Sequence, residues 1–562
     1  MNMGVNMLLW ATCVTREHIA ALRAIKAAGA DGVEIPIMEG KIAAYRDLGA
    51  LLDDLGLTRT SSMAFVTPEL NPVSDSPACR QAAADNLKWL IECAHALGAP
   101  VICGPMYQTI GVFSGNGPTE MECECEAGVL RGVAEDARQA GVTLAMEPLN
   151  RFECYMLNTL ADGAALTDRI GPAGGWTVAE VGDGNLNLVF IVTGVAGAVV
   201  VKQALPFIRL VGDSWPLPLN RAFFEYHALV RHAARDGGRV PEVFHFDEEQ
   251  ALIVMRYLAP HVILRKSVVR GVQHGHMARH MGLFLARSLF RGSGLALGGK
   301  ALREDMALFC ANHALADITE SLVFSDPYFD APLNRHTVGL GPFIAPLRAD
   351  RALRVAAQEM KHAFVAKAET LVHGDLHSGS LMVTGDDTQV IDPEFAIYGP
   401  FGFDVGMFLA NILLGYFAQS GHEAVSGARD GYRAYLLAQF AEVWAVFTAE
   451  FGRLWRSERT GLCYARSLFE DAGDAAGAEA ALGAVLRGIW VDALGFCGVE
   501  MHRRILGLAH VEDMEAIGDP ARRWPCEARA LEAGRIIAVM RGSLAVGDIP
   551  ALVQEIERTV AR

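Results

Sequence analysis

The sequence lacks an apolar run long enough to cross a membrane as a helix. Its longest runs, residues 188–201 and 405–418, extend for about fourteen residues and contain Gly or Asn, whereas a spanning helix needs about 20. Residues 1–12 also lack a basic segment followed by a small-residue cleavage site, so no export signal is predicted. We therefore expect no membrane partner.

Cysteine is sparse and follows no metal-binding pattern. The eleven cysteines are scattered, and the adjacent Cys123 and Cys125 lack the spacing of metal ligands. Reduced thiols, and with them a cytoplasmic location, are the expected state. Basic residues are also outnumbered, with 49 Lys and Arg against 65 Asp and Glu and a net charge of −16. This balance argues against nucleic acid as a partner.

What the chain does have is length and apolar content. Its 562 residues predict two or three domains. A hydrophobic fraction of 51% with 20% charged residues is ample for packed cores, so disorder is not expected.

The first 170 residues repeat a pattern of a strand followed by a helix. Five short apolar runs, each followed by an amphipathic stretch, predict βα units and a parallel sheet. The expected strands are 5–10, 32–36, 58–65, 100–104 and 142–147, and the expected helices are 16–28, 41–55, 78–97, 120–140 and 161–170.

Four segments within this region, DGVEIP, GAPVICGPMY, SGNGPTE and MEPLNRFECYMLNT, resemble the sugar isomerase/epimerase type of TIM barrel, near the ketose 3-epimerases. The resemblance implies that Glu147 binds a divalent metal and moves the sugar's proton, and that Glu153 helps to hold substrate. A closed barrel needs eight strands, and the family's other metal ligands come from strands that this chain does not provide. We therefore expect Glu147 and Glu153 to be vestigial.

Five βα units leave two uncovered sheet edges, which are an association hazard. We expect this partial barrel either to pack its open side on the rest of the chain or on a second copy, as in a homodimer, or to be poorly stable. The breaker-rich residues 171–175, GPAGG, predict a short and tight joint to the next domain.

Two acidic motifs dominate the later part of the chain. An apolar pair leads into His373-Gly374-Asp375, and a β-type run at 388–391 ends at Asp392-Pro393-Glu394. Two strands joined at 385–387 would form a hairpin that brings Asp375 and Asp392 to the same edge. Phosphoryl transfer from ATP needs one carboxylate at the attacking hydroxyl and another on the magnesium ion. The alternative is a structural hairpin whose acids only cap turns.

HGDLHSGS and IDPEFAIYGPFGFDVG closely resemble the 5-methylthioribose kinases, a branch of the protein-kinase-like small-molecule kinases. The resemblance runs from about Trp176 to the C-terminus. It implies a bilobal kinase fold of the aminoglycoside/choline kinase type, with lobes at 171–258 and 259–562 after the partial barrel of 1–170. It also implies ATP and Mg²⁺ as cofactors and 5-methylthioribose as substrate, with Asp375 as catalytic residue and Asp404 bracing the catalytic loop. Asp392, with Pro393 and Glu394, would hold metal and nucleotide.

Strands at 178–181 and 188–192, joined by a Gly-rich turn, suit close approach to phosphate oxygens, although no Walker A lysine follows. Lys202 ends an apolar run at 197–203, where an unpaired ammonium would be costly. In a kinase N-lobe this lysine contacts phosphates and pairs with a helix glutamate, for which Glu225 is the candidate. Glu225 could equally be a solvated helix residue. The resemblance makes Asn187 a nucleotide contact.

The resemblance also assigns Trp215 to a lid near the nucleotide. Arg256, Tyr257 and Leu258 follow a strand at 250–255 and occupy the place of the hinge, whose backbone would meet the adenine edge. Relatives usually carry Glu-Asp-Leu there.

The remaining chain is expected to be mostly helical, with helices at 277–291, 305–315 and 352–367. A late apolar helix at 496–510 carries Arg503 and Arg504, which need anionic or hydroxyl partners. The resemblance makes them a clamp on substrate and phosphate; the alternative is a salt bridge to a nearby acid. Which of the two faces substrate stays open.

The expected fold is thus α/β plus α+β, a partial (β/α) barrel followed by a kinase. The expected reaction is ATP-dependent phosphorylation of 5-methylthioribose at its anomeric hydroxyl. Two alternatives stay open: a kinase for another hydroxyl compound, such as an aminoglycoside, choline or a different pentose, and a bifunctional kinase and ketose epimerase. The partial barrel could also serve association alone.

Overall fold

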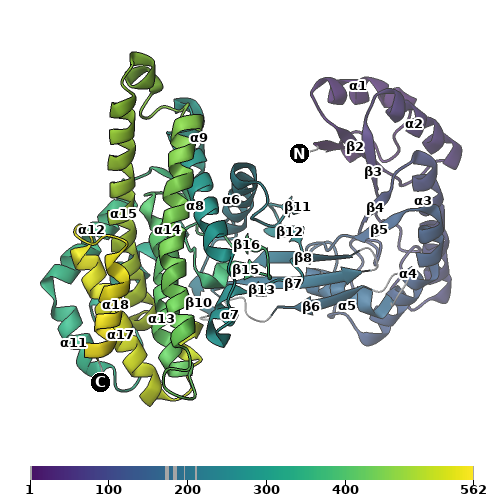
Figure 1. Cartoon of the computed structure of the whole chain (residues 1–562). Helices are drawn as coiled ribbons and strands as arrows, with labels where there is room; N and C mark the ends of the chain where they lie inside the picture. Colours follow the sequence, from purple (N-terminus) through teal and green to yellow (C-terminus); the bar gives the residue numbers. More distant parts are fainter. Residues whose placement is uncertain (1–2, 171–175, 182–185, 195–196, 209–211, 561–562) are drawn as a thin grey trace. The chain divides into compact units, whose positions relative to one another are not determined.

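A computed structural model describes residues 3–170, 176–181, 186–194, 197–208 and 212–560 (Figure 1). The chain divides into two compact units, Met1–Ala179 with Ile191–Ala198, and Glu180–Phe190 with Val199–Arg562. The Gly-rich joint at 171–175 lies outside the described residues, and the boundaries at 170/171 and 258/259 stay predictions.

The first unit is the partial barrel that the sequence predicts. Its five strands are all parallel and follow chain order across the sheet. The strands are β1 (Gly4–Asn6), β2 (Gly32–Pro36), β3 (Thr58–Ser62), β4 (Val101–Gly104) and β5 (Thr143–Met146), and the helices are α1 (Ile19–Ala27), α2 (Ile42–Asp54), α3 (Pro77–Leu97), α4 (Glu120–Ala140) and α5 (Leu160–Ile170). All five predicted βα units are therefore confirmed.

The two faces of this sheet differ in chemistry. Along β2 the buried Val33 and Ile35 alternate with the half-buried Glu34, as the two-residue period of a strand requires. The buried side chains join a core with α2, α3 and α4, and Figure 1 shows the helices lined up along the outside of the sheet. Among the described strands, β1 and β5 each pair on one side only.

A second five-stranded sheet follows, in the order β11-β12-β8-β7-β6. Most of β6 and parts of β7 and β8 are grouped with the first unit, and the rest of the sheet is grouped with the second. These strands are β6 (Thr177–Glu180), β7 (Asn187–Gly194), β8 (Gly197–Ala204), β11 (Val243–Asp247) and β12 (Leu252–Arg256). Helix α6 (Arg221–Asp236), which carries the predicted Glu225, packs beside this sheet on β11 and β12. A two-stranded ribbon, β9 (Phe207–Ile208) with β10 (Gly212–Pro216), precedes α6.

Most of the second unit is helical, with one large apolar core. Its helices are α7 (Leu264–Arg270), α8 (Met277–Arg291), α9 (Gly299–Cys310), α10 (His313–Leu322), α11 (Gly341–Ala349), α12 (Arg351–Ala366), α13 (Gly402–His422), α14 (Asp430–Glu458), α15 (Ala475–Leu506), α16 (Glu512–Glu515), α17 (Pro520–Met540) and α18 (Asp548–Thr559). Within the described residues, α15 alone is long and apolar enough to span a membrane by length and composition. Its second half is buried against α13 and α17, as expected of a core helix.

The predicted hairpin at 385–387 is present, as β15 (Leu381–Val383) and β16 (Thr388–Val390), with β13 (Val262–Ile263) beside it. The apolar pair before His373 belongs to a different sheet, in which β14 (Thr370–Val372) pairs with β17 (Ile397–Gly399). Asp375 therefore lies on a loop between two small sheets and not on a hairpin strand.

The predicted helix at 305–315 is wrong, because the chain breaks there between α9 and α10. Asn312 sits at the break, and its buried amide donates to the carbonyl oxygens of Glu394 at 2.9 Å and Ala396 at 3.0 Å. Asn312 is the N-cap of α10, but its side chain makes no cap hydrogen bond and bonds to the carbonyls of the other segment instead. The break thus supports the segment that carries Glu394.

Candidate active site

Asp404 holds the loop that carries Asp375 through two hydrogen bonds to its backbone. The Asp404 carboxylate, at the start of α13, accepts from the backbone N–H of His373 at 2.6 Å and of Gly374 at 3.1 Å. Burial raises the pKa of Asp404. Gly374 has a φ of +89°, and a Cβ there would lie 2.1 Å from the carbonyl oxygen of Phe395, so only glycine fits this bend.

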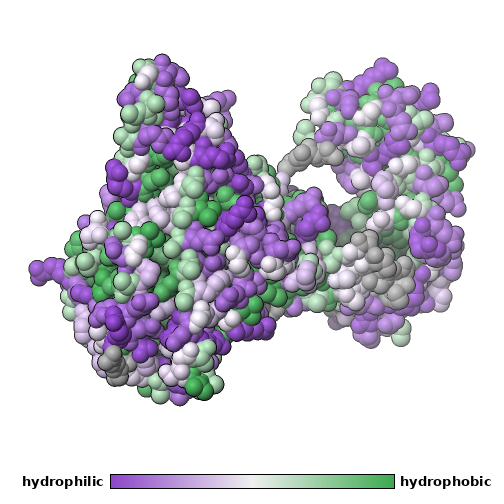
Figure 2. Space-filling model, viewed as in Figure 1, coloured by the Kyte–Doolittle hydropathy of each residue, from purple (hydrophilic) through white to green (hydrophobic). Residues whose placement is uncertain are grey.

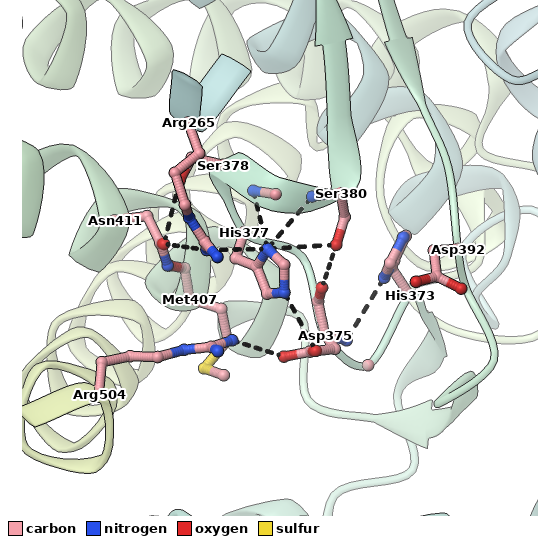
Figure 3. Close-up of polar contacts among 12 residues, drawn as sticks. Arg265, His373, Asp375, His377, Ser378, Ser380, Asp392, Met407, Asn411 and Arg504 are labelled. Carbon is pink, nitrogen blue, oxygen red and sulfur yellow. Dashed lines mark hydrogen bonds and ion pairs between the residues drawn. The ribbon is translucent and has the colours of Figure 1, made fainter. Parts of the chain in front are cut away.

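His373 links the two acidic motifs. Its Nδ1 accepts from the backbone N–H of Asp375 at 3.3 Å, and its Nε2 donates to the carbonyl oxygen of Ile391 at 2.9 Å. Figure 3 shows the imidazole between Asp375 and Asp392. A further bond from Ile391 N–H to the Ser380 carbonyl, at 3.0 Å, closes the open end of the hairpin. The loop of Asp375 and the strand end before Asp392 are therefore fastened together.

Three side chains surround the carboxylate of Asp375. Its Oδ1 lies 2.9 Å from Arg504 Nη2 and 3.3 Å from Arg503 Nη1, while its Oδ2 lies 3.2 Å from His377 Nε2. Figure 3 shows the contacts of Arg504 and His377 with Asp375. Burial alone would raise the pKa of Asp375, but the charges and hydrogen bonds of these neighbours hold it well below its ordinary value. The fully buried Glu500 accepts from both arginines, at 2.5 Å from Arg504 Nε and 3.2 Å from Arg503 Nη1.

Lys202 lies among acidic side chains. Its Nζ is 2.8 Å from Glu225 Oε1 and also bonds to Asp392, so the predicted partner of the lysine is in place. Burial disfavours the ammonium, yet the charges of Asp392 and Glu225 outweigh it and raise the pKa of Lys202. Burial raises the pKa of Glu225 to about 8, against the opposing charge of Lys202. Burial acts in the same direction on Asp392, but Lys202 lowers its pKa overall.

Oxygen ligands for a divalent cation converge beside this lysine. Carboxylate oxygens of Glu225, Asp392 and Glu394 all lie within 4.8 Å of one another, and across the described ranges this is the one such group of three or more. Hard cations such as Mg²⁺ prefer carboxylate oxygens, so the donor set fits. Asp392 is the accessible member, with its side chain 46% exposed, while Glu225 and Glu394 are buried.

The buried Arg221 on α6 contacts both Asn187 and Glu394. Arg221, the first residue of α6, donates to Asn187 Oδ1 from Nε at 3.1 Å and from Nη2 at 2.9 Å, and its Nε lies 3.4 Å from Glu394 Oε2. Asn187 donates in turn to Glu394 Oε2 at 3.0 Å. The amide of Asn187 is thus directed into the protein. The Gly-rich turn at 182–185 lies outside the described residues.

The contacts given above do not include the predicted lid and hinge residues. Trp215, on β10, packs against an apolar cluster formed by Leu217, Leu315, Ile318 and Leu322. Arg256 ends β12 and pairs with Glu242 at the surface, and its backbone N–H already bonds to the Glu242 carbonyl at 2.8 Å. Tyr257 and Leu258, which follow it, are half-buried.

In the first unit, Glu147 and Glu153 are both exposed. Glu147 follows β5, and its backbone N–H donates to the Gly104 carbonyl at 3.1 Å. The Glu153 carboxylate accepts from Asn150 Nδ2 at 2.6 Å.

Several contact residues escaped prediction from the sequence, namely Arg221, Arg265, Asn312, His373 (named only as part of its motif), His377 and Glu500. For some of them a local signal exists. Arg221 stands four residues before Glu225, and Glu500 stands four before Arg504, so each pair shares a helix face. The other contacts join segments far apart in sequence, such as Asn312 with Glu394, and leave no local trace.

Comparisons with known proteins match two different families to the earlier and later parts of the chain. Residues 177–445 match the family described as "Phosphotransferase enzyme family", and residues 22–177 match "Xylose isomerase-like TIM barrel". Methylthioribose kinase 1 of Oryza sativa is 42% identical over 70% of this chain and 92% of its own length. A methylthioribose kinase of Escherichia coli is 41% identical over 65% of this chain and 87% of its own.

Among solved structures, the first unit is similar to an L-ribulose 3-epimerase, with 27% identity, a TM-score of 0.29 and coverage of 31% of this chain. It is also similar to a D-allulose 3-epimerase from Methylomonas sp., with 21% identity, a TM-score of 0.28 and coverage of 31% of this chain. The chain spans 58% and 60% of the lengths of these two structures.

Proposed function

The chain belongs to the methylthioribose kinase family, and on that premise we propose that it transfers the γ-phosphoryl group of ATP to 5-methylthioribose. The product is 5-methylthioribose 1-phosphate, formed at the anomeric hydroxyl. The observation that supports the proposal is the link through His373, which joins the loop of Asp375 to the strand end before Asp392, one of three carboxylates whose oxygens converge.

In this proposal Asp375 receives the sugar hydroxyl. Its low pKa keeps the carboxylate ionised, so it accepts a hydrogen bond from the hydroxyl and aims the oxygen at phosphorus. As the new P–O bond forms and the P–O bond to ADP breaks, the hydroxyl proton passes to the Asp375 carboxylate and from there to solvent. Arg503 and Arg504, already at Asp375, are positioned to offset charge that develops on the transferred phosphoryl group.

Asp392 and Glu394, with Glu225 beside them, would hold Mg²⁺, which when bound neutralises charge on the nucleotide phosphates. Lys202 would contact the same phosphates while Glu225 keeps its ammonium in place. We assign Asn187 and Pro393 to the nucleotide side and the backbone of residues 256–258 to the adenine edge. Trp215, the expected lid near the nucleotide, is assigned as a contact of the substrate as well.

Two wider proposals concern the whole chain. We place the protein in the cytoplasm, a proposal supported by its eleven free cysteines. We also propose a homodimer, supported by the unpaired outer sides of β1 and β5. We propose no epimerase reaction, because the one group of three metal-ligating side chains within the described residues lies in the second unit.

A substrate panel tests the proposed reaction. The purified full-length chain, ATP and Mg²⁺ are offered 5-methylthioribose, ribose, choline or kanamycin, and ADP release is followed. We expect release that depends on methylthioribose and is far slower with the other three. A faster rate with any of them would contradict the assignment.

A further inference from the structure

The two ring nitrogens of His377 face different surroundings (Figure 3). Nδ1 lies 2.9 Å from the backbone nitrogen of Gly379, 3.1 Å from that of Ser380 and 3.1 Å from Arg265 Nη2. Nε2 lies 3.2 Å from Asp375 Oδ2. One side of the ring therefore meets three nitrogen donors, and the other meets a carboxylate.

This arrangement fixes the position of the ring proton. Backbone N–H groups and a guanidinium donate hydrogen bonds and accept none. Ser380 Oγ also lies 3.3 Å from Nδ1, but its hydrogen goes to the Asp375 carbonyl at 2.9 Å. A proton on Nδ1 would face three donors, so Nδ1 is the bare acceptor and Nε2 carries the hydrogen. His377 is consequently a neutral donor to Oδ2.

Its surroundings keep the ring neutral. Burial lowers the pKa of His377 to about 3, with Arg504 and Arg265 acting in the same direction and Asp375 opposing them. Asp513, which lies 3.4 Å from Arg265, balances that guanidinium on its far side. The His377 ring also packs closely on the backbone of Gly379, where a Cβ would lie 2.7 Å from His377 Cε1 and 2.9 Å from Nδ1.

We propose that His377 is a positioning residue for the phosphoryl transfer, acting through Asp375. Arg503 and Arg504 hold Oδ1, and His377 holds Oδ2. Together they stop rotation of the carboxylate about its Cβ–Cγ bond, so that one remaining lone pair is aimed at the acceptor hydroxyl. The backbone cap at Nδ1 selects the tautomer that makes this possible. The inference rests on the proposed kinase function.

Two substitutions test the roles of the two ring nitrogens one at a time. In His377→Asn the amide oxygen replaces Nδ1 and can still cap Gly379 and Ser380, but nothing reaches Asp375. In His377→Gln the amide nitrogen replaces Nε2 and can still donate to Oδ2, but the cap is lost. We expect His377→Asn to lower kcat about tenfold to a hundredfold, the range for a misaligned reacting group, with KM for ATP and the thermal midpoint near wild type. We expect His377→Gln to keep more of kcat and to unfold at a lower temperature.

A wild-type kcat in His377→Asn would overturn the proposal. So would a larger loss of kcat in His377→Gln than in His377→Asn when both variants are folded. These comparisons are made only after the wild-type chain has shown turnover with 5-methylthioribose; its failure to do so would contradict the proposed function instead.

A readout independent of turnover tests the tautomer itself. Nitrogen-15 spectra of histidine-labelled protein, with the His377 signals identified by their loss in His377→Asn, should show protonated Nε2 and bare Nδ1 from about pH 5.5 to about pH 8. Protonation of both nitrogens in that range, or a hydrogen on Nδ1, would overturn the proposal.

Discussion

His373 donates from Nε2 to the carbonyl oxygen of Ile391 at 2.9 Å, while its Nδ1 receives the backbone N–H of Asp375. One imidazole thus fastens the loop of the proposed catalytic aspartate to the strand end that leads into Asp392. The bridge fixes the separation of these two segments, and in the proposed reaction it would thereby set the distance between the acceptor hydroxyl and the nucleotide phosphates.

Replacing His373 by Phe keeps a planar aromatic ring and removes both bonds. The Asp375 N–H and the Ile391 carbonyl would be left without this partner in a buried place, at a cost of about 1–3 kcal/mol of unfolding free energy. We expect kcat to fall about a hundredfold as the two acids lose their fixed spacing. Urea unfolding and steady-state kinetics measure the two effects. The exposed His313→Phe is the control, and equal behaviour of the two variants would contradict the bridge.

Arg504 should matter more than Arg503. Arg504 lies closer to Asp375 than Arg503 does, 2.9 Å against 3.3 Å, and also makes the shorter contact with Glu500. Lysine keeps the charge but cannot donate to both acids as a planar fork. We expect Arg504→Lys to reduce kcat/KM for 5-methylthioribose about tenfold more than Arg503→Lys does. The reverse order would show that the arginines exchange roles when substrate binds.

Arg221 should control nucleotide affinity from a distance. It is fully buried and donates to Asn187 Oδ1 and to the Leu186 and Pro218 carbonyls. In Arg221→Met, Asn187 and Glu394 lose this donor, so we expect KM for ATP to rise about tenfold and KM for the sugar to change little. Arg221→Lys should lie between, since it restores charge without the fork. An unchanged KM for ATP in Arg221→Met would contradict this prediction and show that the contacts of Arg221 do not affect nucleotide binding.

We expect Glu126 to make the stability of the first unit depend on pH. This buried glutamate on α4 has an Oε2 without a hydrogen-bond partner, and burial raises its pKa to about 8 from the ordinary 4.5. Between these values the folded state holds a proton that the unfolded state has released. Stability therefore falls as pH rises through that window, by up to about 1.4 kcal/mol per pH unit.

We expect Glu126→Gln to remove this slope and to stabilise the first unit at pH 7.5. Amide hydrogen exchange in the full-length chain, read on β2 to β4, measures the local stability. The exposed Glu92→Gln on α3 is the matched control. A slope that persists in Glu126→Gln would assign the pH dependence to another group.

Sequence patterns were sufficient for elements whose periodicity is local. The βα units, the helix at 277–291 and the hairpin around 385–387 all follow from runs of a few residues. The helix at 305–315 failed because Asn312 is recruited by carbonyls of residues 394 and 396, a demand that no local pattern carries. Propensity yields to tertiary contacts in such places.

The same division applies to the site. Asp375 and Asp392 could be identified from the sequence because they belong to recognisable motifs. Lys202, Arg503 and Arg504 could be identified because they are charged residues within apolar runs. The pairing of Arg504 with Asp375, 129 positions apart, and the inward turn of Asn187 towards Glu394 depend on the folded arrangement. The role of His377 follows from the three donors around its Nδ1, which only coordinates reveal.

The most direct test of the proposed chemistry compares wild type with Asp375→Asn, using 5-methylthioribose and ATP with product identification by phosphorus NMR. We predict that the wild type forms the 1-phosphate and that Asp375→Asn loses about a thousandfold in kcat while still binding ATP. Near-normal turnover in Asp375→Asn, or a phosphate on any other hydroxyl, would contradict the central role of this carboxylate.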